Sequence, residues 1–162
     1  MIDEIDNKIL SILQDDARTS NAEIARRLAM APSAILERIR KLETRGLIAS
    51  YEARLNPKAL HAGLLAFIFV IADERTGTDD AGRLLANMPE VQEVHHIAGE
   101  DCYLVKVRIA DTDALGELLR QRFGAIESIR STRTTIVLST LKETAQIPLP
   151  SSLEKEDLPD AG

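Results

Sequence analysis

The sequence has few of the residues that build disulfides, metal sites or membrane spans. Its 162 residues include one cysteine, three histidines and no tryptophan, and only 3% are aromatic. Cys102 alone cannot form an internal disulfide, and histidines without a second cysteine argue against a structural metal, so we expect none. No apolar run approaches the roughly 20 residues that cross a bilayer. The N-terminus lacks the basic, then apolar, pattern of a signal peptide, so we expect a cytoplasmic protein without a membrane partner.

An overall excess of basic residues is also absent, because the formal net charge is −6. Residues 1–60 hold ten Lys/Arg against nine Asp/Glu, whereas residues 61–162 hold ten against seventeen. The acidity therefore belongs to the second part of the chain. A local basic face in the first part is enough for contacts with phosphates, so nucleic-acid binding stays open.

Three amphipathic segments predict three short helices in the first fifty residues. The first begins after Asp3 and the second after Ser20, which are residue types that cap helix N-termini. The third begins at Pro32, which suits the first helical position, and ends at Gly46. Ala31, directly before this helix, offers no capping oxygen. Three helices with short joints, the third with an outward polar and basic face, predict a helix-turn-helix.

The segment "LIASYEARLNP" after Gly46 predicts a strand and a polar exit from this domain. We therefore expect a winged helix-turn-helix over residues 1–50, in which the strand serves as the wing, and a linker strand over 51–61.

The second half of the chain changes its period to that of strands alternating with helices. The run 64–72 is continuously apolar, which predicts a strand covered on both faces. The other expected strands are 91–99, 102–111 and 133–141, and the expected helices are 79–90 and 112–123. This β-α-β-β-α-β order predicts a ferredoxin-like domain over 62–142 and an α+β protein. Residues 143–162 are acidic and rich in proline, so we expect a mobile tail.

The third helix carries the candidate contacts to DNA. Positions near its N-terminus approach base edges in helix-turn-helix proteins, arginines suit guanine or phosphates, and polar residues at the start of the second helix suit the DNA backbone. The alternative is an ordinary solvated helix face. The candidates are Ser20, Asn21, Ser33, Ala34, Glu37, Arg38, Arg40, Lys41 and Arg45.

The order of motifs across both halves resembles the Lrp/AsnC family of regulators. The matching stretches are "IDNKILSILQDDAR", "SNAEIARRLAMAPSAILERIRKLETRGLI", "YEARLNP", "GEDCYLVKVR" and "STRTTIVLST", which together span residues 2 to about 142. The resemblance implies a transcriptional regulator that binds double-stranded DNA. It also implies that the second domain, called RAM in this family, pairs into dimers and then tetramers or octamers. An amino acid or a related small molecule would bind between dimers and change DNA binding or assembly.

The resemblance also implies an effector pocket at the "GEDCY" loop. Its implied lining is Gly99, Glu100, Asp101, Cys102, Tyr103, Thr134, Thr135 and Ile136. The alternative is a purely structural turn at Gly99. Two positions depart from the family pattern, because Cys102 stands where many members have Asp, and Ala31 stands where Ser is usual.

Two other functions share this architecture. Sirohaem decarboxylases are enzymes with a similar two-domain build, and the pair His95-His96 is the feature that invites this interpretation. Adjacent strand residues point to opposite faces, however, so these two histidines cannot share a metal. An architectural DNA-binding protein without an effector is the other alternative. The capped helix-turn-helix favours a regulator that is not an enzyme and needs no cofactor.

Overall fold

The structure, a computed structural model, describes residues 2–73, 79–99 and 102–149. The chain divides into two compact units. The first contains the residues up to Arg54 together with the segment from Glu143, and the second spans Leu55–Lys142. The division thus lies near the boundary expected at residue 50, but the segment from Glu143 belongs with the N-terminal unit.

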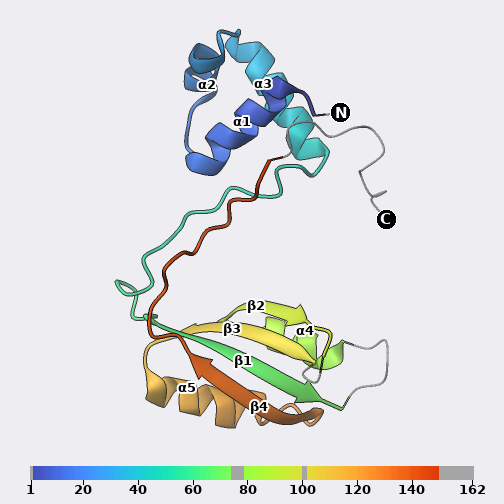
Figure 1. Cartoon of the computed structure of the whole chain (residues 1–162), viewed down its shortest axis with the longest axis vertical. Coiled ribbons are helices and arrows are strands. Elements are labelled where there is room, and N and C mark those ends of the chain that lie inside the picture. The colour runs from blue at the N-terminus through green and yellow to red at the C-terminus, as the bar shows by residue number, and fades with distance from the viewer. Residues whose placement is uncertain (1, 74–78, 100–101, 150–162) are drawn as a thin grey trace. The chain divides into compact units, whose positions relative to one another are not determined.

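The N-terminal unit contains helices α1 (Glu4–Asp15), α2 (Asn21–Leu28) and α3 (Pro32–Thr44) (Figure 1). The side chain of Asp3 accepts a hydrogen bond from the Asp6 N–H at 2.8 Å and so caps α1. Ser20 caps α2 in the same way, accepting from the Glu23 N–H at 3.2 Å. The N-terminus of α3 has Pro32 and no side-chain cap, as the sequence predicts. The helices begin where these local signals place them.

One apolar face of each helix meets in a small core. Each fully buried aliphatic side chain contributes about 1.5–3 kcal/mol, so this core is what holds three short helices together. Its buried members are Ile9, Leu10, Ile24, Ala25, Ile35, Ile39 and Leu42.

No strand forms between the third helix and the second unit. Residues 49–56 have no regular structure, and a turn follows at 57–61, where the Ala62 N–H donates to the Pro57 carbonyl at 2.8 Å. The wing strand expected after Gly46 and the linker strand expected at 51–61 therefore do not form within this single chain. A strand needs a neighbouring strand to bond with, and none is paired with this stretch within the described residues.

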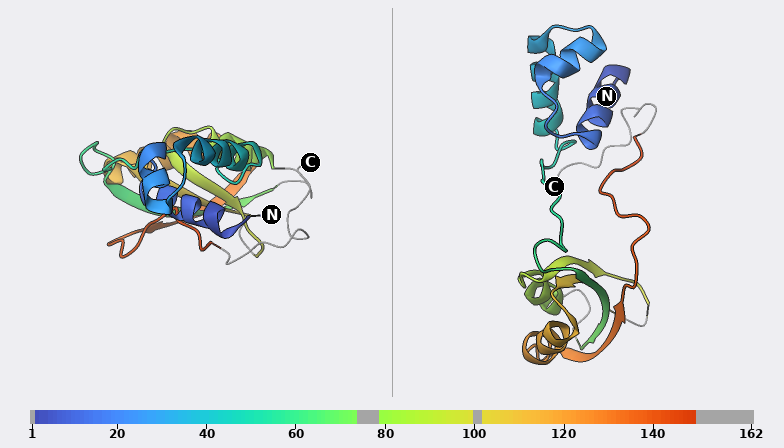
Figure 2. Two further views of the ribbon diagram at one scale, coloured as in Figure 1. Left: turned by 90° about the horizontal axis from the view of Figure 1, so that it is seen from above. Right: turned by 90° about the vertical axis from the view of Figure 1, so that its left-hand side faces the viewer.

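The second unit is a four-stranded antiparallel sheet with helices on one face (Figure 1; Figure 2, right). The strand order is β2-β3-β1-β4, which is that of a ferredoxin-like βαββαβ domain. The elements are β1 (Leu64–Ala72), α4 (Asp80–Ala86), β2 (Val91–His96), β3 (Tyr103–Ile109), α5 (Thr112–Leu118), the π-helical turn η1 (Leu119–Phe123) and β4 (Ile129–Ile136). The bounds of β1 agree with the sequence prediction, whereas β4 begins four residues earlier than expected.

The two faces of the sheet differ in what covers them. Ile68, Val70 and Val105 are fully buried and belong to a core that also includes Leu85 of α4 and Phe123 of η1. The residues that alternate with them along β1 are only half-buried. The expectation that both faces of β1 are covered is therefore wrong for a single chain. We call the uncovered side, which carries Phe67, Phe69, Ile71, Leu104 and Lys106, the open sheet face.

Candidate DNA-binding and effector sites

The turn between α2 and α3 has the length that a helix-turn-helix requires. Helix α2 ends at Leu28, and Ala29 adopts the left-handed conformation with φ of 52°. Its N–H donates back to the carbonyls of α2, and Pro32 begins α3 three residues later. This short joint fixes the direction in which α3 leaves the turn.

The outward side of α3 carries most of the expected DNA contacts. Three core residues face inward, so the positions opposite them lie in solvent. Ser33, Glu37, Arg40, Lys41 and Arg45 are exposed, and Ala34 and Arg38 are half-buried. Ser20 is exposed at the α2 cap, while Asn21 is half-buried. The structure thus brings the candidates to one side of the motif, with Ser20 and Asn21 at the start of the neighbouring helix.

Two of the basic side chains on α3 are already engaged by acids. The Lys41 amine lies 2.7 Å from the Glu37 carboxylate one turn away, and this hydrogen bond lowers the pKa of Glu37. Both side chains are about two-thirds exposed, at 69% and 67%, so the pair exchanges readily with other partners. A DNA phosphate can take the place of this carboxylate.

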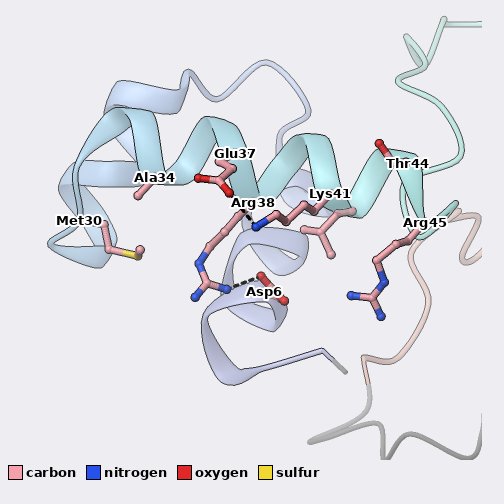
Figure 3. Close-up of a pocket in the computed structure, with 9 residues that line it drawn as sticks. Asp6, Met30, Ala34, Glu37, Arg38, Lys41, Thr44 and Arg45 are labelled. Carbon is pink, nitrogen blue, oxygen red and sulfur yellow. Dashed lines mark hydrogen bonds and ion pairs between the residues drawn. The ribbon is translucent and has the colours of Figure 1, made fainter.

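Arg38 is held more firmly, by two carboxylates of α1. Its Nη1 lies 2.7 Å from Asp3 Oδ2. The same Nη1 lies 2.7 Å from Asp6 Oδ1, a contact drawn in Figure 3. The Arg38 side chain is 29% exposed and that of Asp6 only 11%. The Asp6 N–H, and after it the Arg38 guanidinium, lower the pKa of Asp3. We call these three residues the Arg38 clamp, because they fix the start of α1 against the middle of α3.

A groove of about 560 Å³ runs beside the clamp along α3 (Figure 3). Met30, Ala34 and Leu42 contribute apolar side chains to its lining, and Lys41 and Arg45 contribute cationic ones. The groove therefore joins the outward face of α3 to the N-terminus of α1 and combines apolar surface with cationic groups.

Helix α2 carries a second group of paired charges. The Glu23 carboxylate accepts hydrogen bonds from Arg26 at 2.7 Å and from Arg27 at 2.8 Å, and together they lower the pKa of Glu23 to about 2. One carboxylate thus serves two guanidinium groups. The Glu23 N–H donates to the Ser20 side chain, while the Glu23 carboxylate binds the two arginines.

The expected effector residues that the structure describes lie in the loop before β3, at the start of β3 and on β4. Tyr103 at the start of β3 pairs with Val70 of β1. Thr134, Thr135 and Ile136 of β4 pair with residues 68, 67 and 66 of the same strand. Strand β1 therefore separates the two groups by two strand spacings, about 10 Å.

The described part of the loop is built as a tight structural joint. Gly99 has φ of 145°, a conformation that favours glycine. The Cys102 thiol donates to the Ala72 carbonyl and accepts from its N–H, both at 3.4 Å. Glu100 and Asp101, the expected partners of an ammonium group, lie outside the described residues.

Tyr103 is directed into the core. It is 2% exposed, and its ring lies so close to Gly82 of α4 that a Cβ there would be 2.7 Å from Tyr103 Cε1. The His96 ring stacks on it with centroids 5.1 Å apart. The Tyr103 ring thus packs against α4 and holds this helix on the sheet.

The two histidines point to opposite faces, as expected for adjacent strand residues. His96 lies on the helix-covered side with Tyr103, whereas His95 lies 3.2 Å from Glu93 on the open sheet face. Lys106 and His95 both lower the pKa of Glu93, Lys106 more strongly. The described residues contain no group of three or more potential metal ligands.

The two acidic residues of the Arg38 clamp, Asp3 and Asp6, are not predicted from the sequence. Asp3 and Asp6 are recognisable as residues of a helix N-terminus, but their pairing with Arg38 spans more than thirty residues. No sequence pattern within a few residues predicts such a contact.

The fold and the surface of α3 define a class of protein: a helix-turn-helix DNA-binding unit joined to a small α+β ligand-binding domain. Residues 2–43 match the AsnC-type helix-turn-helix domain, and residues 65–147 match the Lrp/AsnC ligand binding domain. The chain belongs to the Lrp/AsnC family of transcriptional regulators.

Characterised relatives cover nearly the whole chain. The leucine-responsive regulatory protein of Escherichia coli K12 is 35% identical over 150 residues, 90% of each chain. The structure of E. coli AsnC matches with a TM-score of 0.84 and 30% identity over 91% of this chain and 99% of that one.

Two similar structures were solved with L-methionine. A Neisseria meningitidis transcriptional regulator matches with a TM-score of 0.85 and 30% identity over 91% of this chain and 97% of that one. A feast or famine regulatory protein from Mycobacterium tuberculosis matches with a TM-score of 0.83 and 35% identity over 91% and 99%. Among the described residues of the present chain, no helix is long and apolar enough to cross a membrane.

Proposed function

We propose that this protein is a cytoplasmic transcriptional regulator that binds double-stranded DNA through α3 and responds to an amino acid. The observation that carries the proposal is the outward side of α3, where Ser33, Glu37 and Arg40 are exposed behind a three-residue turn from a capped α2. This is the geometry in which a helix reads base edges in the major groove.

The roles of individual residues follow from their surroundings. Ser33, Ala34 and Glu37 near the start of α3 approach base edges, and Glu37 accepts from cytosine when Lys41 transfers to a phosphate. Arg40, Lys41 and Arg45 contact phosphates or guanine, and Ser20 and Asn21 contact the DNA backbone. Arg38 acts differently from the others, because its guanidinium holds α1 in place.

Self-association follows from the open sheet face. Its apolar side chains lie beside cationic ones: Arg133 lies over the Phe69 ring at 4.2 Å, and Lys106 pairs with Glu93 at 2.8 Å. Two such faces pack together and bury the apolar side chains of both chains, giving a dimer that presents two α3 helices. Larger assemblies, tetramers or octamers, would present more.

The effector is an amino acid bound where chains meet. The expected residues around Gly99, Cys102 and Thr134–Ile136 need a second chain to close a pocket, and two regulators of similar structure were solved with L-methionine. L-Methionine is therefore the first amino acid to test, and leucine the second, because the E. coli relative is named for its response to leucine.

The test is a gel shift with the DNA upstream of the protein's own gene, in about 50 to about 300 mM salt and with each amino acid. We expect binding that weakens steeply with salt and changes with one amino acid. Arg40→Ala should weaken binding, whereas the matched control Arg122→Ala, an exposed arginine of η1 in the other unit, should not. Binding that ignores every amino acid would leave an architectural DNA-binding protein. Absence of binding to this DNA and to a random-site library, with an absorbance change on adding sirohaem, would instead support the enzyme.

A further inference from the structure

The segment that follows β4 is bound to the first helix of the DNA-binding unit. The Gln14 side chain forms two hydrogen bonds with the backbone of Ile147: it accepts from the N–H at 2.8 Å and donates to the carbonyl at 3.2 Å. The Gln146 side chain donates to the Gln14 carbonyl at 3.2 Å and to Asp15 Oδ1 at 3.0 Å. Two glutamines thus bind this segment to the last turn of α1.

Two further contacts extend this attachment on both sides. Leu149 packs against the core of the DNA-binding unit, and Glu143 lies 3.4 Å from Arg54. Residues 143–149, expected to be the start of a mobile tail, are therefore part of the N-terminal unit. We call them the strap.

The strap gives the chain a second tether between its two units. The N-terminal connector, from the end of α3 at Thr44 to the start of β1 at Leu64, comprises residues 45–63. The C-terminal connector, from Ile136 of β4 to the anchored Gln146, comprises only residues 137–145. At roughly 3.3–3.6 Å per residue, the first can span at most about 70 Å and the second about 35 Å. The shorter connector therefore sets how far the units can separate.

We propose that the strap is a coupling device, which limits the reach of the DNA-binding unit and carries changes at the end of β4 to the last turn of α1. The four hydrogen bonds of Gln14 and Gln146 that attach it lie at the exposed surface, so each is weak and the attachment can be released. When the strap is attached to α1, it confines each α3 to a short range of positions. Released, it leaves only the longer connector and allows more widely spaced DNA half-sites. The device does not depend on the proposed DNA contacts or on the amino acid.

The first test is hydrogen exchange of the Ile147 amide in the full chain. We expect about tenfold slower exchange than in an unstructured peptide, lost in the Gln14→Ala variant, since a protected amide needs its acceptor. Gln14→Glu keeps the acceptor and loses the donor, so it should retain part of the protection. An unprotected Ile147 amide in the unchanged protein would overturn the proposal.

The second test measures distance within one chain. Spin labels are placed on the exposed positions Ala22 and Ala125 of a Cys102→Ser chain, which is mixed with a large excess of unlabelled protein so that only distances within a chain are observed. Deleting residues 143–162 from the labelled chain should lengthen and broaden the distance distribution. Deleting only residues 150–162, which keeps the strap, should leave it unchanged.

A third variant separates release of the strap from loss of folding. The double substitution Gln14→Ala and Gln146→Ala keeps Leu149 in the core and should reproduce the longer distances, with the helix content unchanged by circular dichroism. Unchanged distances in both the deletion and the double variant would refute the tether. Because the excess partners carry an intact strap, a strap that docks between chains would leave the distances of the deletion variant unchanged, and that result alone would refute a tether within the chain.

Discussion

Replacing Arg38 with alanine should destabilise the DNA-binding unit without removing a phosphate contact. The Asp6 side chain is only 11% exposed, so loss of its charged hydrogen bond costs about 1.5–3 kcal/mol. Asp3 is 49% exposed, and its pair with Arg38 contributes about 0–1 kcal/mol. The sum predicts a loss of about 1.5–4 kcal/mol in the free energy of unfolding. Arg40→Ala, the matched control at an exposed position two residues further along α3, should cost less than about 0.5 kcal/mol.

The assay is chemical denaturation followed by far-UV circular dichroism, at one protein concentration because assembly adds to stability. A cycle with Asp6→Asn should show that Arg38 and Asp6 are coupled by about 1–2 kcal/mol. DNA binding by the folded Arg38→Ala variant should keep its dependence on salt, whereas Arg40→Ala should lower the slope of log K against log salt by about 1. The reverse pattern, an unchanged stability with a reduced salt slope for Arg38→Ala, would show that Arg38 contacts phosphate and that the clamp has no structural role.

Three further predictions concern other paired groups. Burial and a 2.9 Å hydrogen bond to Glu43 raise the pKa of Tyr51 to about 12. The tyrosinate absorbance of Tyr51 should therefore appear near pH 12 rather than 10, and Tyr51→Phe, which lacks this absorbance, identifies it. The pKa of Glu23 is lowered to about 2, so its ion pairs stabilise the fold above pH 4.5. This contribution is lost as the pH falls toward 2. In Glu23→Gln, the free energy of unfolding should therefore fall less steeply with decreasing pH. Gly82→Ala would place a Cβ 2.7 Å from the Tyr103 ring and should lower the free energy of unfolding by about 1–3 kcal/mol, measured by denaturation. The control Gly63→Ala, where the closest side-chain atom is at 3.5 Å, should leave the free energy of unfolding unchanged.

Local chemistry made the helices and the central strand predictable. Asp3 and Ser20 cap their helices, and Pro32 begins α3, because each acts on amides within a few residues. Gly46 has φ of 69° after α3, as the sequence indicates. The bounds of β1 follow from a bounded apolar run. Signals of this kind need no knowledge of the rest of the chain.

Features that depend on distant partners were not predictable. An isolated stretch such as 51–56 looks like a strand, but a strand exists only beside another, and within the described residues none pairs with it. The strap looks like a tail because it begins an acidic, proline-rich stretch, yet Gln146 bonds to Asp15 across more than 130 residues of sequence. Arg38 looks like the other basic residues of α3, and only the folded structure reveals its acidic partners.

The same pairing of charges explains how an acidic protein can bind DNA selectively. Glu37 engages Lys41, and Glu23 engages two arginines of α2, so a single DNA-binding unit presents much less free positive charge than its count of Lys and Arg suggests. Non-specific affinity depends on the number of phosphates neutralised, so each unit alone binds any DNA weakly. When a dimer or larger assembly places several units on one DNA, the weak contributions combine through a high effective concentration. Affinity would then depend on how many α3 helices reach their half-sites together, which is the property that the proposed assembly and strap would control.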